Sequence, residues 1–294
     1  MELKGNDLVK YKEILVNCLK VFDSFCLKHN LKYYAAYGTA LGAIRHHGFI
    51  PWDDDIDVIM PRKDYDRLLD LKEEFGDSYK VFSICDKGYY KKFAKFVDMR
   101  TSLWEDKNIP FMIGAFIDIF PLDGTPSDDI TESLKFRNKY VLSYWNIKRS
   151  MATYSFAGML KNLILPLDII TVIKNLYSAL WLKLRKDSLI KKHSELEDTV
   201  KKFRNGLYYA SYWGIYKDKE IVPKEWFNGS IVYPFENYHI RVPINYDNYL
   251  KHLYGDYMKL PPIEKQDSHH THYYYNLEKR VTIEEARKII DNGL

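Results

Sequence analysis

The segment that most constrains the fold is Asp55-Ile56-Asp57-Val58-Ile59-Met60, in which polar and apolar residues first alternate as they do in a β-strand. Side chains two apart on a strand share a face, so Asp55 and Asp57 would project together. Two carboxylates held that close repel each other unless a cation lies between them. An all-oxygen ligand set favours Mg²⁺, and Mn²⁺ would fit as well. We therefore predict that Asp55 and Asp57 hold a divalent metal ion.

The residues before this strand predict an anion-binding turn. Tyr33 to Tyr37 suit a buried strand, and Gly38-Thr39 would turn sharply into a short helix over Leu41 to His46. Free backbone NH groups at the start of that helix would face an anion. Asp53 and Asp54, between the helix and the acidic strand, are interpreted as part of a solvated turn.

A third acid is expected on a neighbouring strand. Gly114 to Pro121 is an apolar run with one acid, Asp118, which would be costly to bury without a partner. Asp118 is then a metal ligand or a general base beside the metal. The alternative is an Asp that caps the turn Pro121 to Gly124, in which Asp123 is a turn residue.

Four segments together resemble the LicD family. They are Gly38-Thr39-Ala40-Leu41-Gly42, the block from Arg45 to Asp57, Phe116 to Pro121, and Tyr254 to Pro262, so the resemblance covers about residues 30 to 270. The family comprises phosphocholine transferases of bacterial surface glycans, related to fukutin-type ribitol-phosphate transferases, with a nucleotidyltransferase-like fold.

This resemblance implies the Mg²⁺-dependent transfer of a phospho-alcohol, most often phosphocholine, from a CDP-activated donor such as CDP-choline. The acceptor would be a hydroxyl of a cell-surface glycan or its lipid-linked precursor, as in lipopolysaccharide or teichoic acid synthesis, and CMP would leave. Gly38 and Thr39 would bind the donor phosphates, while Asp55, Asp57 and Asp118 would be the catalytic and metal-binding acids. CDP, choline and the glycan rest on the resemblance alone.

Three cations are candidates for binding the donor. Lys95 and Arg100 lie on and after the strand-like stretch Lys91 to Val97, where the alternative is a solvated strand edge blunted by lysines. Arg45 follows the anion-binding turn by one short helix, and a solvated helix end is an equal alternative.

Histidines occur at two places near the expected site. His46 and His47 are interpreted either as a proton shuttle or as charge at a helix C-terminus. The Ser268 to His272 tract lacks the cysteines or paired acids of a zinc site. The resemblance implies only that His269 or His270 lines the site.

Composition favours a cytoplasmic enzyme. The chain has 294 residues, of which 46% are hydrophobic, enough for a sizeable core. Its three cysteines form no disulfide or metal pattern, and no signal peptide is visible at the N-terminus. A net charge of +4 spread over 44 basic and 40 acidic residues does not indicate a nucleic-acid partner.

The segment from Met159 to Leu184 is rich in apolar residues. It also contains charged residues and a proline, so we do not expect it to span a membrane. Its apolar residues recur every three or four positions, which favours a helix packed on other helices. The alternative is an interfacial helix on the inner face of an anionic membrane, where nearby lysines would meet the headgroups. A lipid-linked acceptor would make such peripheral contact useful.

The order of patterns predicts an α+β fold, a mixed sheet flanked by helices. We expect a nucleotidyltransferase-like core over 1–126, a helical region over 127–205 and a C-terminal strand and helix region over 206–294 packed on the core. Helices are predicted over residues 8–29, 64–75, 246–254 and 283–290.

The chain has 25 tyrosines and 6 tryptophans, and aromatic faces attract quaternary ammonium groups. Trp213, Trp226, Tyr233 and Tyr238 would form a choline box, unless they are plain core. Two other functions stay open: a nucleotidyltransferase that releases pyrophosphate after transfer to a small molecule, protein or RNA, and a non-catalytic binding protein.

Overall fold

The computed structural model describes residues 1–151, 180–203, 206–266 and 270–293. Its centre is a mixed sheet in the order β1 (Tyr34–Ala35), β2 (Asp57–Pro61), β6 (Phe116–Gly124), β4 (Ala94–Asp98) and β3 (Tyr79–Phe82). Only β2 and β6 of these neighbours run parallel. The far end of β6 also pairs with β7 (Tyr208–Ala210), which pairs with β8 (Ile221–Pro223). The predicted α+β class is confirmed.

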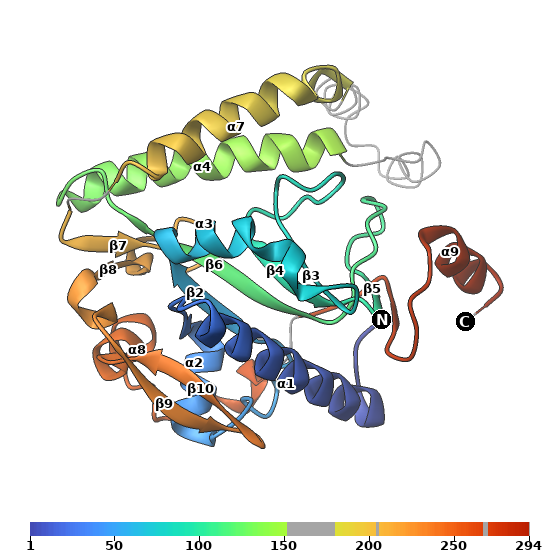
Figure 1. The fold of residues 1–294 in the computed structure, drawn as a ribbon, viewed down its shortest axis with the longest axis horizontal. Helices are drawn as coiled ribbons and strands as arrows, with labels where there is room; N and C mark the ends of the chain where they lie inside the picture. Colours follow the sequence, from blue (N-terminus) through green and yellow to red (C-terminus); the bar gives the residue numbers. More distant parts are fainter. Residues whose placement is uncertain (152–179, 204–205, 267–269, 294) are drawn as a thin grey trace.

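Helices surround this sheet (Figure 1). The long α1 (Gly5–Lys28) contacts β4 and β6, and α3 (Arg62–Asp70) contacts β2 and β6. α2 (Tyr37–His46) lies against α8 (Tyr246–Tyr254) and the hairpin of β9 (Ser230–Phe235) and β10 (Tyr238–Pro243). α4 (Ile130–Met151) and α7 (Lys186–Val200) lie side by side at one edge. β5 (Ser102–Trp104) pairs with β11 (Tyr274–Asn276) before the final helix, α9 (Ile283–Asp291).

Most predicted helices are confirmed within a few residues. α1 buries the predicted face of Tyr11, Leu15, Cys18, Phe22 and Phe25, because apolar residues at helical spacing meet the sheet on one side. α8 has the predicted bounds, and the three cysteines are free thiols. The predicted helix over 64–75 ends earlier, as α3 gives way to a 3₁₀ turn over Lys72–Phe75. The domain boundaries at 126 and 205 stay predictions.

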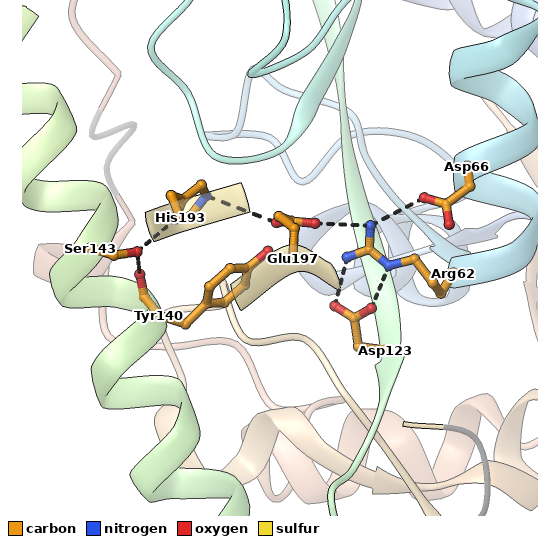
Figure 2. Close-up of polar contacts among 7 residues, drawn as sticks. All are labelled: Arg62, Asp66, Asp123, Tyr140, Ser143, His193 and Glu197. Carbon is orange, nitrogen blue, oxygen red and sulfur yellow. Dashed lines mark hydrogen bonds and ion pairs between the residues drawn. The ribbon is translucent and has the colours of Figure 1, made fainter. Parts of the chain in front are cut away.

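The predicted turn from Pro121 to Gly124 is wrong. β6 continues through Gly124, and Asp123 is buried inside the sheet instead of lying in a turn. Arg62, at the start of α3, makes a two-pronged ion pair with it: Nε lies 2.5 Å from Oδ1 and Nη2 lies 3.0 Å from Oδ2 (Figure 2). This pairing compensates the cost of burying a carboxylate.

The same guanidinium ties the helix pair α4–α7 to the sheet (Figure 2). Arg62 Nη1 lies 3.4 Å from Glu197 Oε2 on α7, and the other Glu197 oxygen lies 3.9 Å from His193 Nε2. His193 Nδ1 in turn meets the Ser143 hydroxyl of α4 at 2.6 Å. Burial lowers the pKa of His193 to about 4, so the ring is neutral near pH 7.

No helix in the described ranges is long and apolar enough to cross a bilayer. Most of the segment from Met159 to Leu184 lies outside the described residues. Of its last residues, Leu182 is buried, whereas Leu180, Trp181 and Leu184 are 59%, 43% and 79% exposed.

Replacing Arg62 with Met should destabilise the protein by about 3 to 5 kcal/mol, because Asp123 would stay buried without a counter-charge. Urea unfolding measures this loss. Arg67→Met on the same helix is the matched control, since Arg67 is exposed and its guanidinium donates to the His29 carbonyl at 3.2 Å; its effect should stay within about 0.5 kcal/mol. A loss below about 1 kcal/mol for Arg62→Met would show that the ion pair does not hold α3 to β6.

Candidate active site

Parallel pairing of β2 and β6 brings two of the predicted acids together. Asp118 lies on the strand next to β2, as predicted, and Asp57 is its register partner. The Asp118 amide donates to the carbonyl of Ile56 at 2.9 Å, which fixes the register at the acidic end of both strands. Asp55 lies two residues before β2 rather than within it, so the predicted strand began too early. Asp55 and Asp57 nevertheless line the same cavity as Asp118.

Gly38 and Thr39, which were predicted to form an anion-binding turn, lie beside these acids. They belong to the first turn of helix α2. The predicted strand over Tyr33 to Tyr37 is wrong at its end, because α2 already begins at Tyr37, which has a left-handed φ of 47°. Thr39 is buried, and its hydroxyl accepts the amide NH of Asp57 at 2.8 Å. In the structure, the Thr39 side chain therefore contacts β2, the strand that begins with Asp57.

Gly38 leaves room for another carboxylate. A β-carbon at this position would lie 2.5 Å from Asp53 Oδ2, closer than side chains tolerate, so any larger residue would displace Asp53. Asp53 thus packs against the first turn of α2, whose N-terminal dipole favours a negative charge.

The interpretation of Asp53 and Asp54 as a solvated turn is wrong. Asp54 is buried, and its Oδ1 lies 2.6 Å from Nδ1 of His270. His270 Nε2 lies 3.5 Å from Asp55 Oδ2. Asp53, Asp55 and His270 each offer a ligand atom, and these atoms all lie within 4.8 Å of one another. His270 therefore lies at the site, while His269 lies outside the described residues.

The acids are short of positive charge. Burial first, and then the charges of neighbouring acids, raise the pKa of Asp55 and of Asp57 well above the usual range. In the described part of the chain, no lysine or arginine forms an ion pair with either carboxylate. Clustered oxygen donors with unmet negative charge fit a hard divalent cation, so the residues present suit Mg²⁺ or Mn²⁺.

Lys95 provides the site with one buried cation. It belongs to β4 in the middle of the sheet, opposite Asp118, and its side chain is 1% exposed. The alternative of a solvated strand edge is wrong for this residue. Lys95 Nζ lies 2.7 Å from Asp118 Oδ1 and 3.7 Å from Glu105 Oε1. Burial raises the pKa of Asp118, and Lys95 opposes that rise.

The two predicted donor-binding arginines have different positions. Arg45 lines the larger cavity of the site and donates to the carbonyl of Tyr257 at 2.6 Å, so it anchors the segment after α8. Arg100 lies beyond the end of β4, where its guanidinium pairs with Asp98 Oδ2 at 2.6 Å and faces away from the acids. The structure therefore does not bring Arg100 to the cluster.

The predicted aromatic box is wrong, since its members pack in separate places. Trp213 packs on Tyr140, Trp226 packs on His252, and Tyr233 pairs with Tyr246. Tyr238 donates to Asp23. Of the four, Trp213 alone lines a cavity of the site.

Two cavities meet at Asp55, Asp118 and His270. The larger, of about 1070 Å³, has aromatic walls and several cations. Its aromatic lining comprises Tyr37, Trp52, Phe93, Phe120, Trp213, Tyr216, Tyr254 and Tyr257. The smaller, of about 230 Å³, shares these three residues and is lined mainly by charged and polar side chains.

Sequence reasoning did not identify Lys91, Lys92, Glu105 and His272 as cavity-lining residues. They come from loops and strand ends without a motif. The acidic run from Asp53 to Asp57 was the one signal that could have added Asp53 and Asp54, because three consecutive acids before a buried strand are unusual for a free turn.

Comparisons with known proteins agree with the motifs. Residues 30–162 match the family model described as LicD/FKTN/FKRP, nucleotidyltransferase domain. The lipopolysaccharide cholinephosphotransferase LicD of Haemophilus influenzae is 32% identical over 281 residues, which cover 94% of this chain and 100% of that protein. An uncharacterized protein of Rickettsia prowazekii is 35% identical over 79 residues, or 25% of this chain and 30% of that one. The match along the full length of the Haemophilus protein confirms the resemblance, and this chain belongs to the LicD family.

Proposed function

We propose that this protein transfers phosphocholine from CDP-choline to a hydroxyl of a cell-surface glycan or its lipid-linked precursor, with release of CMP. The observation that carries the proposal is the pairing of Asp57 with Asp118 beside Asp55, at the junction of two cavities. The relative from Haemophilus influenzae, a lipopolysaccharide cholinephosphotransferase, supports the choice of alcohol and acceptor.

Asp55 and Asp57 would hold a divalent cation, since these two partly exposed carboxylates line the same cavity and, among the described residues, neither forms an ion pair with a lysine or arginine. When bound, Mg²⁺ would offset negative charge on the donor phosphates and on the departing CMP. Asp53 and His270 lie close enough to add ligand atoms around Asp55. Lys95 holds the Asp118 carboxylate in place through its 2.7 Å contact.

Asp118 lines both cavities, so its carboxylate stands where an incoming hydroxyl would meet the donor. We assign to it the acceptance of the hydroxyl proton. Burial raises its pKa above that of an ordinary aspartate, which makes the carboxylate a better proton acceptor.

The donor would occupy the larger cavity. A volume of about 1070 Å³ lies at the upper end of the range for small-molecule sites and suits a nucleoside diphosphate with its alcohol. Arg45 and Lys92 line this cavity and would face the phosphates. Burial lowers the pKa of Lys92 to about 8, and its Nζ lies 4.9 Å from the centre of the Trp213 ring. Gly38 and Thr39, at the start of α2, would lie beside the phosphates.

The family description contains the word nucleotidyltransferase, which favours one other function, the transfer of a nucleoside monophosphate with release of pyrophosphate. The two reactions differ in their products. Incubation with CDP-alcohols, Mg²⁺ and candidate glycans should release CMP, whereas pyrophosphate release from a nucleoside triphosphate would support the other reaction.

Replacing Asp57 with Asn should lower CMP release at least about 100-fold, because the variant loses both a charged ligand and a counter-charge for the donor phosphates. Its affinity for Mn²⁺, measured by electron paramagnetic resonance, should fall as well. Asp70→Asn, at the exposed end of α3, is the matched control. It should keep the wild-type rate of CMP release and the wild-type affinity for Mn²⁺. Normal Mn²⁺ affinity in Asp57→Asn would refute the ligand assignment.

Replacing Asp118 with Asn should also lower the rate at least about 100-fold, because an amide cannot accept the proton. This variant should keep its Mn²⁺ affinity, which separates a base from a ligand. A loss of Mn²⁺ affinity equal to that of Asp57→Asn would instead place Asp118 in the ligand set.

We propose further that the protein works at the cytoplasmic face of the membrane, where a lipid-linked acceptor would be reached. Leu180, Trp181 and Leu184 present an exposed apolar surface beside Lys183 and Arg185, and Arg185 lies 4.7 Å from the centre of the Trp181 ring. Aromatic and apolar side chains next to basic ones suit an anionic bilayer surface.

In a flotation assay, the protein should rise with vesicles that contain phosphatidylglycerol and stay behind with phosphatidylcholine vesicles. The double variant Trp181→Ser, Leu184→Ser should lose most of this binding, since apolar burial in the interface is removed. Leu27→Ser, at an exposed leucine of α1, is the control. Wild-type protein that ignores anionic vesicles would contradict the membrane proposal.

A further inference from the structure

The position and size of the smaller cavity suggest that it binds a different substrate from the larger one. It lies between α1, β4, the start of β6 and the segment from His270 to His272, and it touches the larger cavity at the acids. Its volume of about 230 Å³ is below the usual range of about 300 to 1000 Å³ for whole small-molecule ligands. It can therefore hold a fragment the size of one sugar ring but not a nucleotide.

One side chain in this cavity lacks the partners that a buried polar group needs. His272 is 6% exposed, and among the described residues no hydrogen-bond partner meets either of its ring nitrogens. The backbone holds the ring in this position: the His272 amide donates to the Met1 carbonyl at 2.8 Å, and the next amide, of Tyr273, donates to the Trp104 carbonyl at 2.7 Å. A buried polar group without a hydrogen-bond partner is destabilising, and a ligand that hydrogen-bonds to it would remove that cost.

The charges around the cavity narrow the class of that ligand. Lys91 Nζ lies 2.9 Å from Glu105 Oε1, and Lys95 Nζ lies 3.1 Å from the centre of the Phe116 ring. A quaternary ammonium would meet both lysines, would find the Phe116 face already covered, and has no NH or OH group for His272.

A phosphate is equally disfavoured. It would meet the carboxylates of Glu105, Asp54 and Asp118, which all line this small space. Lys91 and Lys95 hold the pKa of Glu105 at about 2 although burial opposes them, so Glu105 is an anion. A neutral ligand with several hydroxyls fits, because hydroxyls donate to carboxylates and accept from ammonium groups.

We propose that the smaller cavity binds the acceptor sugar ring and presents one of its hydroxyls to Asp118, while His272 hydrogen-bonds a neighbouring hydroxyl. The assignment rests on the proposed function and adds which cavity takes which substrate. Donor and acceptor would then meet at Asp55 and Asp118, which both cavities share. His272 is in this view a specificity residue.

The test uses His272→Phe, which keeps the ring beside Tyr11, whose centroid lies 6.3 Å away, but removes both nitrogens. His272→Gln keeps a donor and an acceptor. His252→Phe on α8 is the matched control, since it replaces a histidine that lines neither cavity. Thermal unfolding of each variant reports whether the fold survives.

Sugar contact is measured by saturation-transfer NMR with glucose, galactose and their N-acetylated amino forms, in the presence of CMP and Mg²⁺ to fill the donor side. Donor affinity is measured by calorimetric titration with CDP-choline. We expect at least one sugar to give a signal with wild type, a loss of that signal of about tenfold or more in His272→Phe, and its return in His272→Gln. CDP-choline affinity should stay within twofold of wild type in every variant.

Three results would overturn the inference: a fall in CDP-choline affinity with unchanged sugar contact in His272→Phe, equal sugar contact in His272→Phe and His252→Phe, or no signal from any sugar with wild type. Failure of the proposed function looks different, because wild type would then neither bind CDP-choline nor release CMP, whatever the sugars show.

Discussion

Parallel pairing of β2 with β6 is the constraint on which the site depends. It places Asp57, the first residue of β2, opposite Asp118 near the start of β6, and both side chains line the larger cavity. A shift of one residue in register would turn one acid to the other face of the sheet. The backbone contacts that fix the register, from Asp118 to Ile56 and from Asp57 to Thr39, therefore also fix the site.

Asp57 and Asp118 could be predicted from the sequence because local patterns identify them. Alternation before Val58 and a lone acid in the apolar run around Asp118 depend on neighbours within a few residues, and the structure keeps both. The surroundings of Asp53 and Asp54 depend on distant segments. Asp54 is buried through His270, 216 residues away, and Asp53 fits only because residue 38 is a glycine. The acidic run marks these residues as unusual, but it does not identify the distant partners that bury or hold them.

The positions of the basic and aromatic side chains likewise depend on distant segments of the chain. Lys95 and Arg100 lie five residues apart in one stretch, yet Lys95 lies within β4 opposite Asp118, whereas Arg100 follows the end of that strand and pairs with Asp98. The four aromatic residues predicted to share a box were grouped by composition. Each instead contacts a residue of a different element, as Tyr233 on β9 does with Tyr246 on α8.

The acids on β6 and those around the start of β2 differ in their counter-charges. β6 carries the buried Asp123 and the partly exposed Asp118, and each has a cation of its own: Arg62 for Asp123 and Lys95 for Asp118. Arg62 stabilises a structural acid, whereas Lys95 positions the acid that we propose as the proton acceptor. In the described part of the chain, no lysine or arginine pairs with Asp55 or Asp57, although burial raises the pKa of both. Asp55 has the imidazole of His270 at 3.5 Å instead. This difference in counter-charge is the physical reason for our proposal that a divalent cation binds at Asp55 and Asp57.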